Sequence, residues 1–137
     1  MQNIRPFLRG NIYNKIKTLA TLTENTITKR DLIGMKNLSI KNRILQASQY
    51  IHNEMPVRFA QRIIELEDLP FNINQYHNIT SIRDWYSQSL EDILDVSYPT
   101  KYKHCSTIYN TIDKIVHRHS PTLETMAKGI NELKKTD

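Results

Sequence analysis

The chain has 137 residues, enough for one domain with a buried core. Three glycines, five prolines and 24% charged residues accompany long stretches of 3.6-residue periodicity without strand-like alternation, which favours an all-α fold. No apolar run approaches the ~20 residues of a membrane span, and the single cysteine, Cys105, excludes an internal disulfide and a cysteine-rich zinc site.

The net charge of +5 is concentrated near the N-terminus. Residues 1–43 carry nine Lys/Arg and two acids, whereas residues 44–137 carry ten Lys/Arg and twelve acids. The slightly acidic body argues against nucleic-acid binding. Because no acid precedes Glu24, the basic segment 1–11 is interpreted either as a mitochondrial targeting peptide or as an ordinary basic N-terminus.

The first predicted elements are two short helices. The apolar spacing over Ile12–Leu22 predicts one helix, and residues 23–28 read as a turn. Thr28 is a suitable N-cap for a second helix over Lys29–Met35. Residues 36–42 are predicted to be a loop.

A central helix is predicted from Arg43 to Leu69, ending before Pro70. Pro56 lies inside this helix and is expected to kink or break it. Its C-terminal half carries two adjoining apolar rows, Val57/Ala60/Ile64 and Phe59/Ile63/Leu66, a stripe wide enough for two neighbouring helices. Its N-terminal half is predicted to face inward through Ile44, Ala47 and Ile51.

Two further long helices are predicted. One follows a loop over residues 71–78, is capped by Asn78 or Ser81, and has the inner face Ile79, Ile82, Trp85/Tyr86, Ser89/Leu90 and Ile93/Leu94. The last begins near Lys101–Cys105, bends at Pro121, and has the inner face Ile108, Ile112, Ile115/Val116, His119, Leu123, Met126/Ala127, Ile130 and Leu133. Residues 12–137 are therefore predicted to form an antiparallel four-helix bundle with short N-terminal helices.

Neither phosphate nor metal chemistry is indicated. Gly10, Gly34 and Gly129 are too far apart for a phosphate-cradling loop. His117 and His119 would point roughly 200° apart on a helix, so they are not expected to chelate one ion, and no His-Glu-x-x-His motif is present. We therefore predict no metal and no cofactor within this chain.

One polar patch is predicted inside the bundle. Tyr86 and Ser89 share a helix face, and His119 lies on the apolar face of the last helix. Inward histidines and tyrosines are more often hydrogen-bonded core residues than functional ones. On the residues alone, core packing is the leading interpretation of this patch.

Four motifs occur in order: Met55-Pro56-Val57-Arg58-Phe59-Ala60, Glu65 through Leu69-Pro70, Trp85-Tyr86-x-Gln88-Ser89, and Arg118-His119 followed by Thr125-Met126-Ala127-x-Gly129. Through them, residues 43–134 resemble the N-terminal domain of the mitochondrial pyruvate dehydrogenase kinases and the related branched-chain ketoacid dehydrogenase kinase. Residues 12–42 match loosely. The resemblance implies a regulatory and docking four-helix bundle that precedes a nucleotide-binding domain of the histidine-kinase type.

Members of this family phosphorylate serines on the E1 component of a ketoacid dehydrogenase complex, which inactivates it, and they dock on the lipoyl domains of its E2 core. The resemblance thus implies location in the mitochondrial matrix and E1 and E2 as partners, with the pyruvate complex favoured over the branched-chain one. It implies an inhibitory ketoacid site at Phe59, Tyr86, Ser89, Ile115 and His119, with His119 also an accessory catalytic residue. It implies a lipoyl-docking end at Leu32, Ile33 and Met35.

The chain departs from the family pattern at two points that bear on function. Val116 stands where pyruvate-responsive members carry an arginine, so a ketoacid carboxylate would lose a charge-assisted hydrogen bond worth ~1.5–3 kcal/mol. Asp137 ends the chain ahead of the family's Asp-x-Gly-x-Gly loop. We therefore expect the C-terminal Mg-ATP-binding domain to be absent and the chain to be inactive alone. It is then the regulatory half of a kinase or, alternatively, a stand-alone non-catalytic module that binds lipoyl domains or E1.

Overall fold

The computed structural model describes residues 11–136, and the elements in this part are helical. The α-helices are α1 (Asn11–Ala20), α2 (Lys29–Met35), α3 (Ile40–Glu67), α4 (His77–Leu94), α5 (Cys105–His119) and α6 (Thr122–Thr136). Two 3-10 turns, η2 (Ile73–Gln75) and η3 (Tyr102–His104), precede α4 and α5. Residues 11–136 contain no strand, which confirms the predicted all-α fold. The basic segment assigned to residues 1–11 lies almost wholly outside the described residues.

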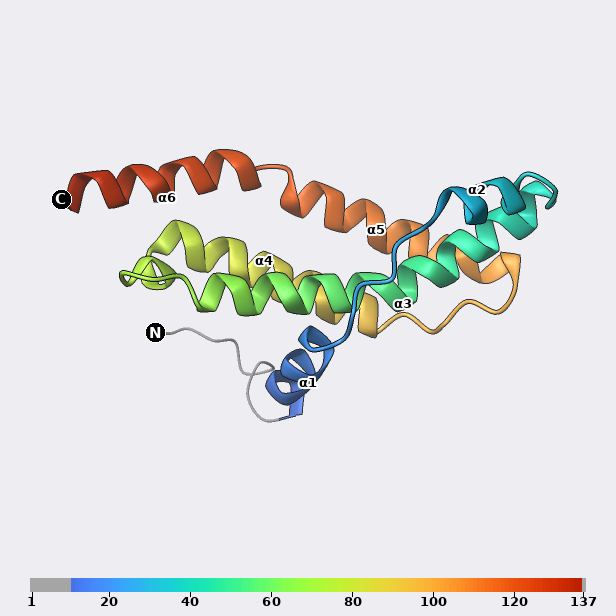
Figure 1. Cartoon of the computed structure of the whole chain (residues 1–137), viewed down its shortest axis with the longest axis horizontal. Helices are drawn as coiled ribbons and strands as arrows, with labels where there is room; N and C mark the ends of the chain where they lie inside the picture. Colours follow the sequence, from blue (N-terminus) through green and yellow to red (C-terminus); the bar gives the residue numbers. More distant parts are fainter. Residues whose placement is uncertain (1–10, 137) are drawn as a thin grey trace.

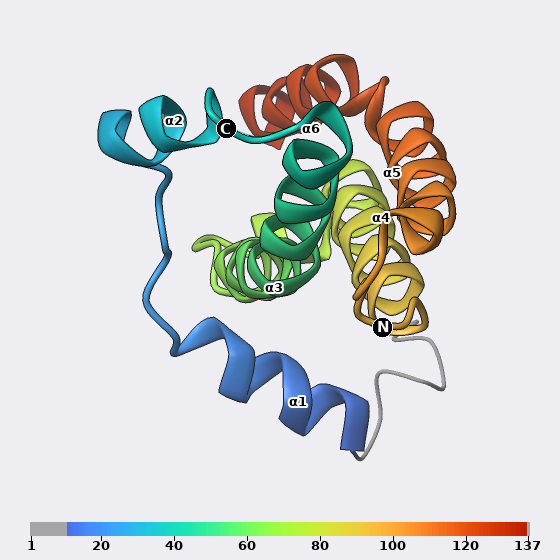
Figure 2. The same cartoon turned by 90° about the vertical axis from the view of Figure 1, so that its right-hand side faces the viewer.

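The long helices run side by side in alternating directions (Figure 1). α3 and α4 are antiparallel, α5 returns along α4, and α6 continues in the direction of α5. α1 packs on α3 but lies across it rather than along it, as the end-on view shows (Figure 2). The bundle is therefore built on α3, α4 and the α5–α6 pair, with α1 as a crossing helix.

Two clusters of buried residues form the core. The larger comprises Ile16, Phe59, Ala60, Ile63, Leu90, Ile93 and Ile115. The smaller comprises Leu66, Ile79 and Ile82. The stripe predicted on the central helix is confirmed, because five of its six residues are buried and Ile64 is partly buried. The inner face predicted around Ile79 and Leu90 is also confirmed.

Pro56 does not break the central helix. α3 continues from Ile40 to Glu67 across this proline, so of the predicted kink or break the break is wrong, and the kink stays a prediction. Pro56 is buried, and so are Glu54 and Val57 on either side of it. Packing of these neighbours holds the helical path although the proline supplies no backbone N–H.

The N-terminal half of α3 faces its neighbours differently from the prediction. Ile44 and Ala47 are exposed, and Ser48 is buried instead. This half contacts the irregular segment before α5, where Gln49 Nε2 donates to the Pro99 carbonyl at 3.0 Å and His52 Nε2 lies 2.6 Å from the Val96 carbonyl. Polar side chains that bond to loop carbonyls therefore replace an apolar row here.

The inner face predicted for the last helix is confirmed only in part. Ile108 and Ile115 are buried, and Met126 packs against the smaller core cluster. The helix divides after His119 into α5 and α6, so one continuous periodic stripe cannot describe both halves. Val116, Leu123, Ala127 and Ile130 are exposed. Gly129 is buried, and a Cβ built on it would lie 3.0 Å from Ile79 Cδ1, so α6 approaches α4 through its glycine face.

The N-cap predicted for α2 is confirmed, whereas the N-caps predicted for α4 are wrong. Thr28 forms a capping box with Asp31 at the start of α2, and α2 has the predicted bounds. α4 instead begins after Tyr76 without a side-chain cap. Asn78 donates to the Glu132 carboxylate, and Ser81 Oγ donates to the His77 carbonyl, so neither of the two predicted residues caps α4.

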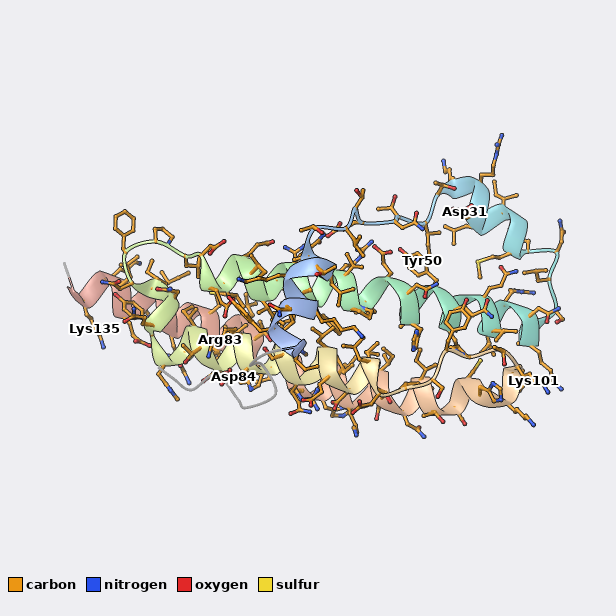
Figure 3. All side chains as sticks on the ribbon, turned by 90° about the horizontal axis from the view of Figure 1, so that it is seen from below. Asp31, Tyr50, Arg83, Asp84, Lys101 and Lys135 are labelled. Carbon is orange, nitrogen blue, oxygen red and sulfur yellow. The ribbon has the colours of Figure 1, made fainter. Side chains whose placement is uncertain are left out.

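The segment between α1 and α2 is tied to α3. Asn25 N–H donates to Glu54 Oε1 at 2.7 Å, and Tyr50 donates to the Asn25 carbonyl at 2.6 Å. Arg58 pairs with the same Glu54, whose side chain is buried. Gln61 Nε2 donates to the Leu22 carbonyl at 2.9 Å. Figure 3 shows Tyr50 on α3 facing this segment. These bonds fix the place from which α2 starts.

Candidate functional site

Three helices bring the predicted ligand-site residues together. Phe59 lies on α3, Tyr86 and Ser89 on α4, and Ile115 and His119 on α5. The Tyr86 and His119 ring centroids are 4.6 Å apart, and the Phe59 centroid lies 5.9 Å from Tyr86 and 6.2 Å from His119. Phe59 and Ile115 belong to the larger core cluster, against which Tyr86 packs. We call these five residues the aromatic cluster.

Hydrogen bonds connect this cluster to an ion pair between α5 and α4. Ser89 Oγ lies 2.8 Å from His119 Nε2. Arg118 Nη1 donates to the same Oγ at 2.9 Å, and Arg118 Nη2 donates to Asp92 Oδ2 at 2.7 Å. Gln88 Nε2 donates to the other Asp92 oxygen at 3.0 Å. Ser89 is therefore the junction between the histidine and the guanidinium.

The state of His119 decides the direction of its bond to Ser89. Arginine only donates, so Ser89 Oγ accepts from Arg118, and it donates to His119 Nε2 when that nitrogen is unprotonated. That nitrogen accepts only in the neutral imidazole, whose second nitrogen then bonds to the Trp85 backbone. Burial lowers the pKa of His119, the charge of Arg118 lowers it further, and the bond to Trp85 opposes both. The folded chain thus favours neutral His119.

The predicted docking residues lie on α2, which buries none of its side chains. Leu32 and Ile33 are 55% and 61% exposed, and Met35 is half-buried. Ile27 and Ile40, just outside the helix, are exposed as well. We call Leu32, Ile33 and Met35 the α2 patch. It lies at the end of the molecule opposite the end of α6 (Figure 1).

The histidines considered for a metal site diverge as expected. The His117 side chain is 79% exposed and approaches Asp113, whereas His119 points into the bundle. Within residues 11–136, no three His, Cys, Asp or Glu side chains lie close enough to hold one metal ion. No helix in the same part of the chain is long and apolar enough to cross a membrane.

The family model for mitochondrial branched-chain α-ketoacid dehydrogenase kinase matches residues 26–137. The match includes the four sequence motifs, the α2 patch and the whole aromatic cluster. The chain belongs to this kinase family. The predicted resemblance is therefore confirmed.

The chain is also similar in sequence to kinases that are named for pyruvate dehydrogenase. The chain is 26% identical over 114 residues to a mitochondrial [pyruvate dehydrogenase (acetyl-transferring)] kinase of Arabidopsis thaliana, covering 83% of this chain and 31% of the relative. It is 32% identical over 90 residues to isozyme 1 of Rattus norvegicus, covering 64% and 20%. The Drosophila melanogaster kinase is 30% identical over 90 residues, covering 64% and 22%. The matches thus span less than a third of each relative.

Val116, the position at which the resemblance predicts a missing arginine, does not contribute to the aromatic cluster. Val116 is 61% exposed on the outer side of α5. The positive charge beside the cluster comes instead from Arg118, which bonds to Ser89 and Asp92. In the sequence, Arg118 stands out only as a motif residue, and no motif includes Asp92. The usable signal was the three-residue spacing of Ser89 and Asp92 on one helix, which lets both meet the same partner.

Proposed function

We propose that the chain is the regulatory and docking domain of a mitochondrial-matrix protein serine/threonine kinase that phosphorylates and inactivates the E1 component of a ketoacid dehydrogenase complex. Pyruvate dehydrogenase is the proposed complex, because the similar kinases named above carry its name. Phosphoryl transfer in the full kinase would require Mg-ATP, for which residues 11–136 offer no phosphate-cradling glycine loop.

The observation that carries the docking role is the exposed α2 patch. Aliphatic side chains of this size are usually buried, and an exposed group of them on one helix marks an interaction surface. The Thr28 capping box defines the start of α2, and the segment that leads into the helix is hydrogen-bonded to α3 through Asn25. A positioned helix with its aliphatic side chains exposed is suited to an apolar lipoyl group, and we assign the patch to the lipoyl domain of E2.

The docking proposal is tested by calorimetric titration of the chain with a lipoylated E2 domain. Leu32→Ala and Ile33→Ala should each weaken binding by about tenfold, since each removes roughly 1–2 kcal/mol of apolar contact. Leu123→Ala is the matched control, because Leu123 is 84% exposed but lies on α6. Equal weakening by all three substitutions, or equal binding of an unlipoylated domain, would refute this assignment.

The aromatic cluster is the proposed ketoacid site. Ser89, His119 and Arg118 supply two neutral polar groups and one cation at one level of the bundle, which suits a keto oxygen and a carboxylate. A carboxylate bound there would compete with Asp92 for the guanidinium. Titration with pyruvate and with a branched-chain ketoacid tests this role, and preference for pyruvate supports the proposed substrate complex. Failure of both to bind would contradict the ligand role.

A further inference from the structure

A cleft of about 1160 Å³ lies between α1, the C-terminal end of α3 and the start of α4. Its charged and aromatic lining comes from Tyr13, Lys17, Glu67, Asp68, His77 and Arg83. None of these residues belongs to the aromatic cluster or to the α2 patch. The cleft is thus a polar feature that the proposed kinase role leaves unexplained.

One side of the cleft is negative. Glu67 is the last residue of α3 and Asp68 follows it, so both acids add to the negative end of the helix dipole. Burial raises the pKa of the Glu67 carboxyl, an effect that Arg83 opposes and Asp68 reinforces. The carboxyl group of Glu67 has no ion pair within 4 Å among the described residues. This side therefore favours a cation.

The other side is positive. The Arg83 side chain is only 12% exposed; its Nη2 pairs with Asp84 at 3.2 Å, whereas its buried Nε has no hydrogen-bond partner. Figure 3 shows both residues on α4, beside the crossing helix α1. Lys17 Nζ lies 4.6 Å above the Tyr13 ring. α4 begins at His77, so the positive end of its dipole faces the same space.

The charged groups on the two sides of the cleft lie near one another without forming direct ion pairs across it. Lys17 and Arg83 lie close enough to influence the pKa of Glu67, yet neither comes within the 4 Å of a direct ion pair. Charges held near one another across an open cleft can be bridged by a molecule that carries both signs.

We propose that this cleft binds a small zwitterion of the α-amino acid class. Its carboxylate would meet Arg83 and Lys17, and its ammonium group would meet Glu67 and Asp68. Ile64 and Ala20 also line the cleft and would contact an apolar side chain. A bound amino acid would join α1 to α4 across the end of α3, which makes the position of the crossing helix depend on ligand.

The test uses the 137-residue chain and isothermal titration calorimetry. The standard amino acids are screened singly at millimolar concentration, and the tightest binder is compared with its amine analogue, which lacks the carboxylate, and its acid analogue, which lacks the ammonium group. For L-phenylalanine these are phenethylamine and 3-phenylpropionate. Each analogue loses charge-assisted hydrogen bonds and should bind at least about tenfold more weakly. Failure of every amino acid to bind would overturn the proposal.

Two substitutions test which cleft residue binds the carboxylate of the amino acid and which binds its ammonium group. Arg83→Gln should weaken binding of the amino acid by about tenfold while leaving binding of the amine analogue unchanged. Glu67→Gln should weaken the amino acid equally and leave the acid analogue unchanged. Glu124→Gln and Lys128→Gln remove an exposed pair on α6 and serve as matched controls, and circular dichroism checks that every variant is folded. An analogue that binds as tightly as the amino acid would reduce the cleft to a single-charge site and contradict the proposal.

Discussion

Two buried serines on α4 allow the hydrogen-bond network to be tested without changing burial. Ser87 and Ser89 are 1% and 0% exposed, so replacing either by alanine removes one buried hydroxyl of the same size. Ser87 Oγ donates only to the Arg83 carbonyl one turn earlier. Ser89 joins Arg118 to His119. Only the partners differ between the two positions.

The expected costs follow from those partners. Ser87→Ala removes a bond to a helical carbonyl and gains helix propensity, so the free energy of unfolding should change by less than about 0.5 kcal/mol. Ser89→Ala leaves a guanidinium N–H and a histidine nitrogen without their partner. Each unsatisfied group costs roughly 1–3 kcal/mol when buried, but the Arg118 side chain is 21% exposed, so water lowers its share. We expect about 2–3 kcal/mol in total.

Urea denaturation followed by circular dichroism measures both variants. The midpoint should fall clearly for Ser89→Ala and stay nearly constant for Ser87→Ala, with unchanged denaturant slopes. The network would be refuted as a stabilising feature if both substitutions had the same effect. A changed slope would instead indicate an altered denatured state.

Three further predictions concern the core and the site. Gly129→Ala should destabilise the chain by about 1 kcal/mol, because its Cβ would meet Ile79 at 3.0 Å and overpacking outweighs the gain in helix propensity. Gly34→Ala is the control and should be neutral or stabilising, because its Cβ meets nothing within 4 Å. The urea midpoint measures the stability of both variants. Because the pKa of His119 is lowered on folding, its stabilising contribution is complete above the unfolded value of about 6.5 and declines as the pH falls toward the folded value. His119→Gln should therefore flatten the loss of stability between about pH 7.5 and 5, and an unchanged slope relative to the parent chain would contradict the assigned neutral imidazole. Tyr86→Phe should change the free energy of unfolding by less than about 1 kcal/mol while weakening pyruvate binding by about tenfold, and a parallel loss of both would favour a purely structural tyrosine.

The parts of the fold that depend on local chemistry were predictable from sequence. Thr28 and Asp31 specify α2 through a capping box, and the broad stripe around Phe59 and Ile63 identifies a helix with neighbours on two sides. Of the kink or break predicted at Pro56, the break does not occur, because tertiary packing keeps α3 continuous where local propensity favours an interruption. Propensity is a weak guide where buried neighbours decide.

In the candidate site, too, features with a local sequence motif were predictable, and features that depend on tertiary contacts were not. The family motifs identified Ser89 and His119, and the structure brings them within hydrogen-bonding distance. The ion pair of Arg118 with Asp92 joins residues 26 positions apart. The spacing of Ser89 and Asp92 places both on one helix face, but it does not identify Arg118 as their shared partner. Leu123 was predicted inward because periodicity reports an apolar face without reporting which element covers it.

The most direct measurement of the docking claim is a ¹H–¹⁵N correlation spectrum of the labelled chain titrated with the lipoylated E2 domain. We predict shifts confined to the amides of the α2 patch and the segment before it, and none with the unlipoylated domain. Shifts centred on α6, or no shifts at saturating concentration, would contradict the claim that this bundle docks through α2.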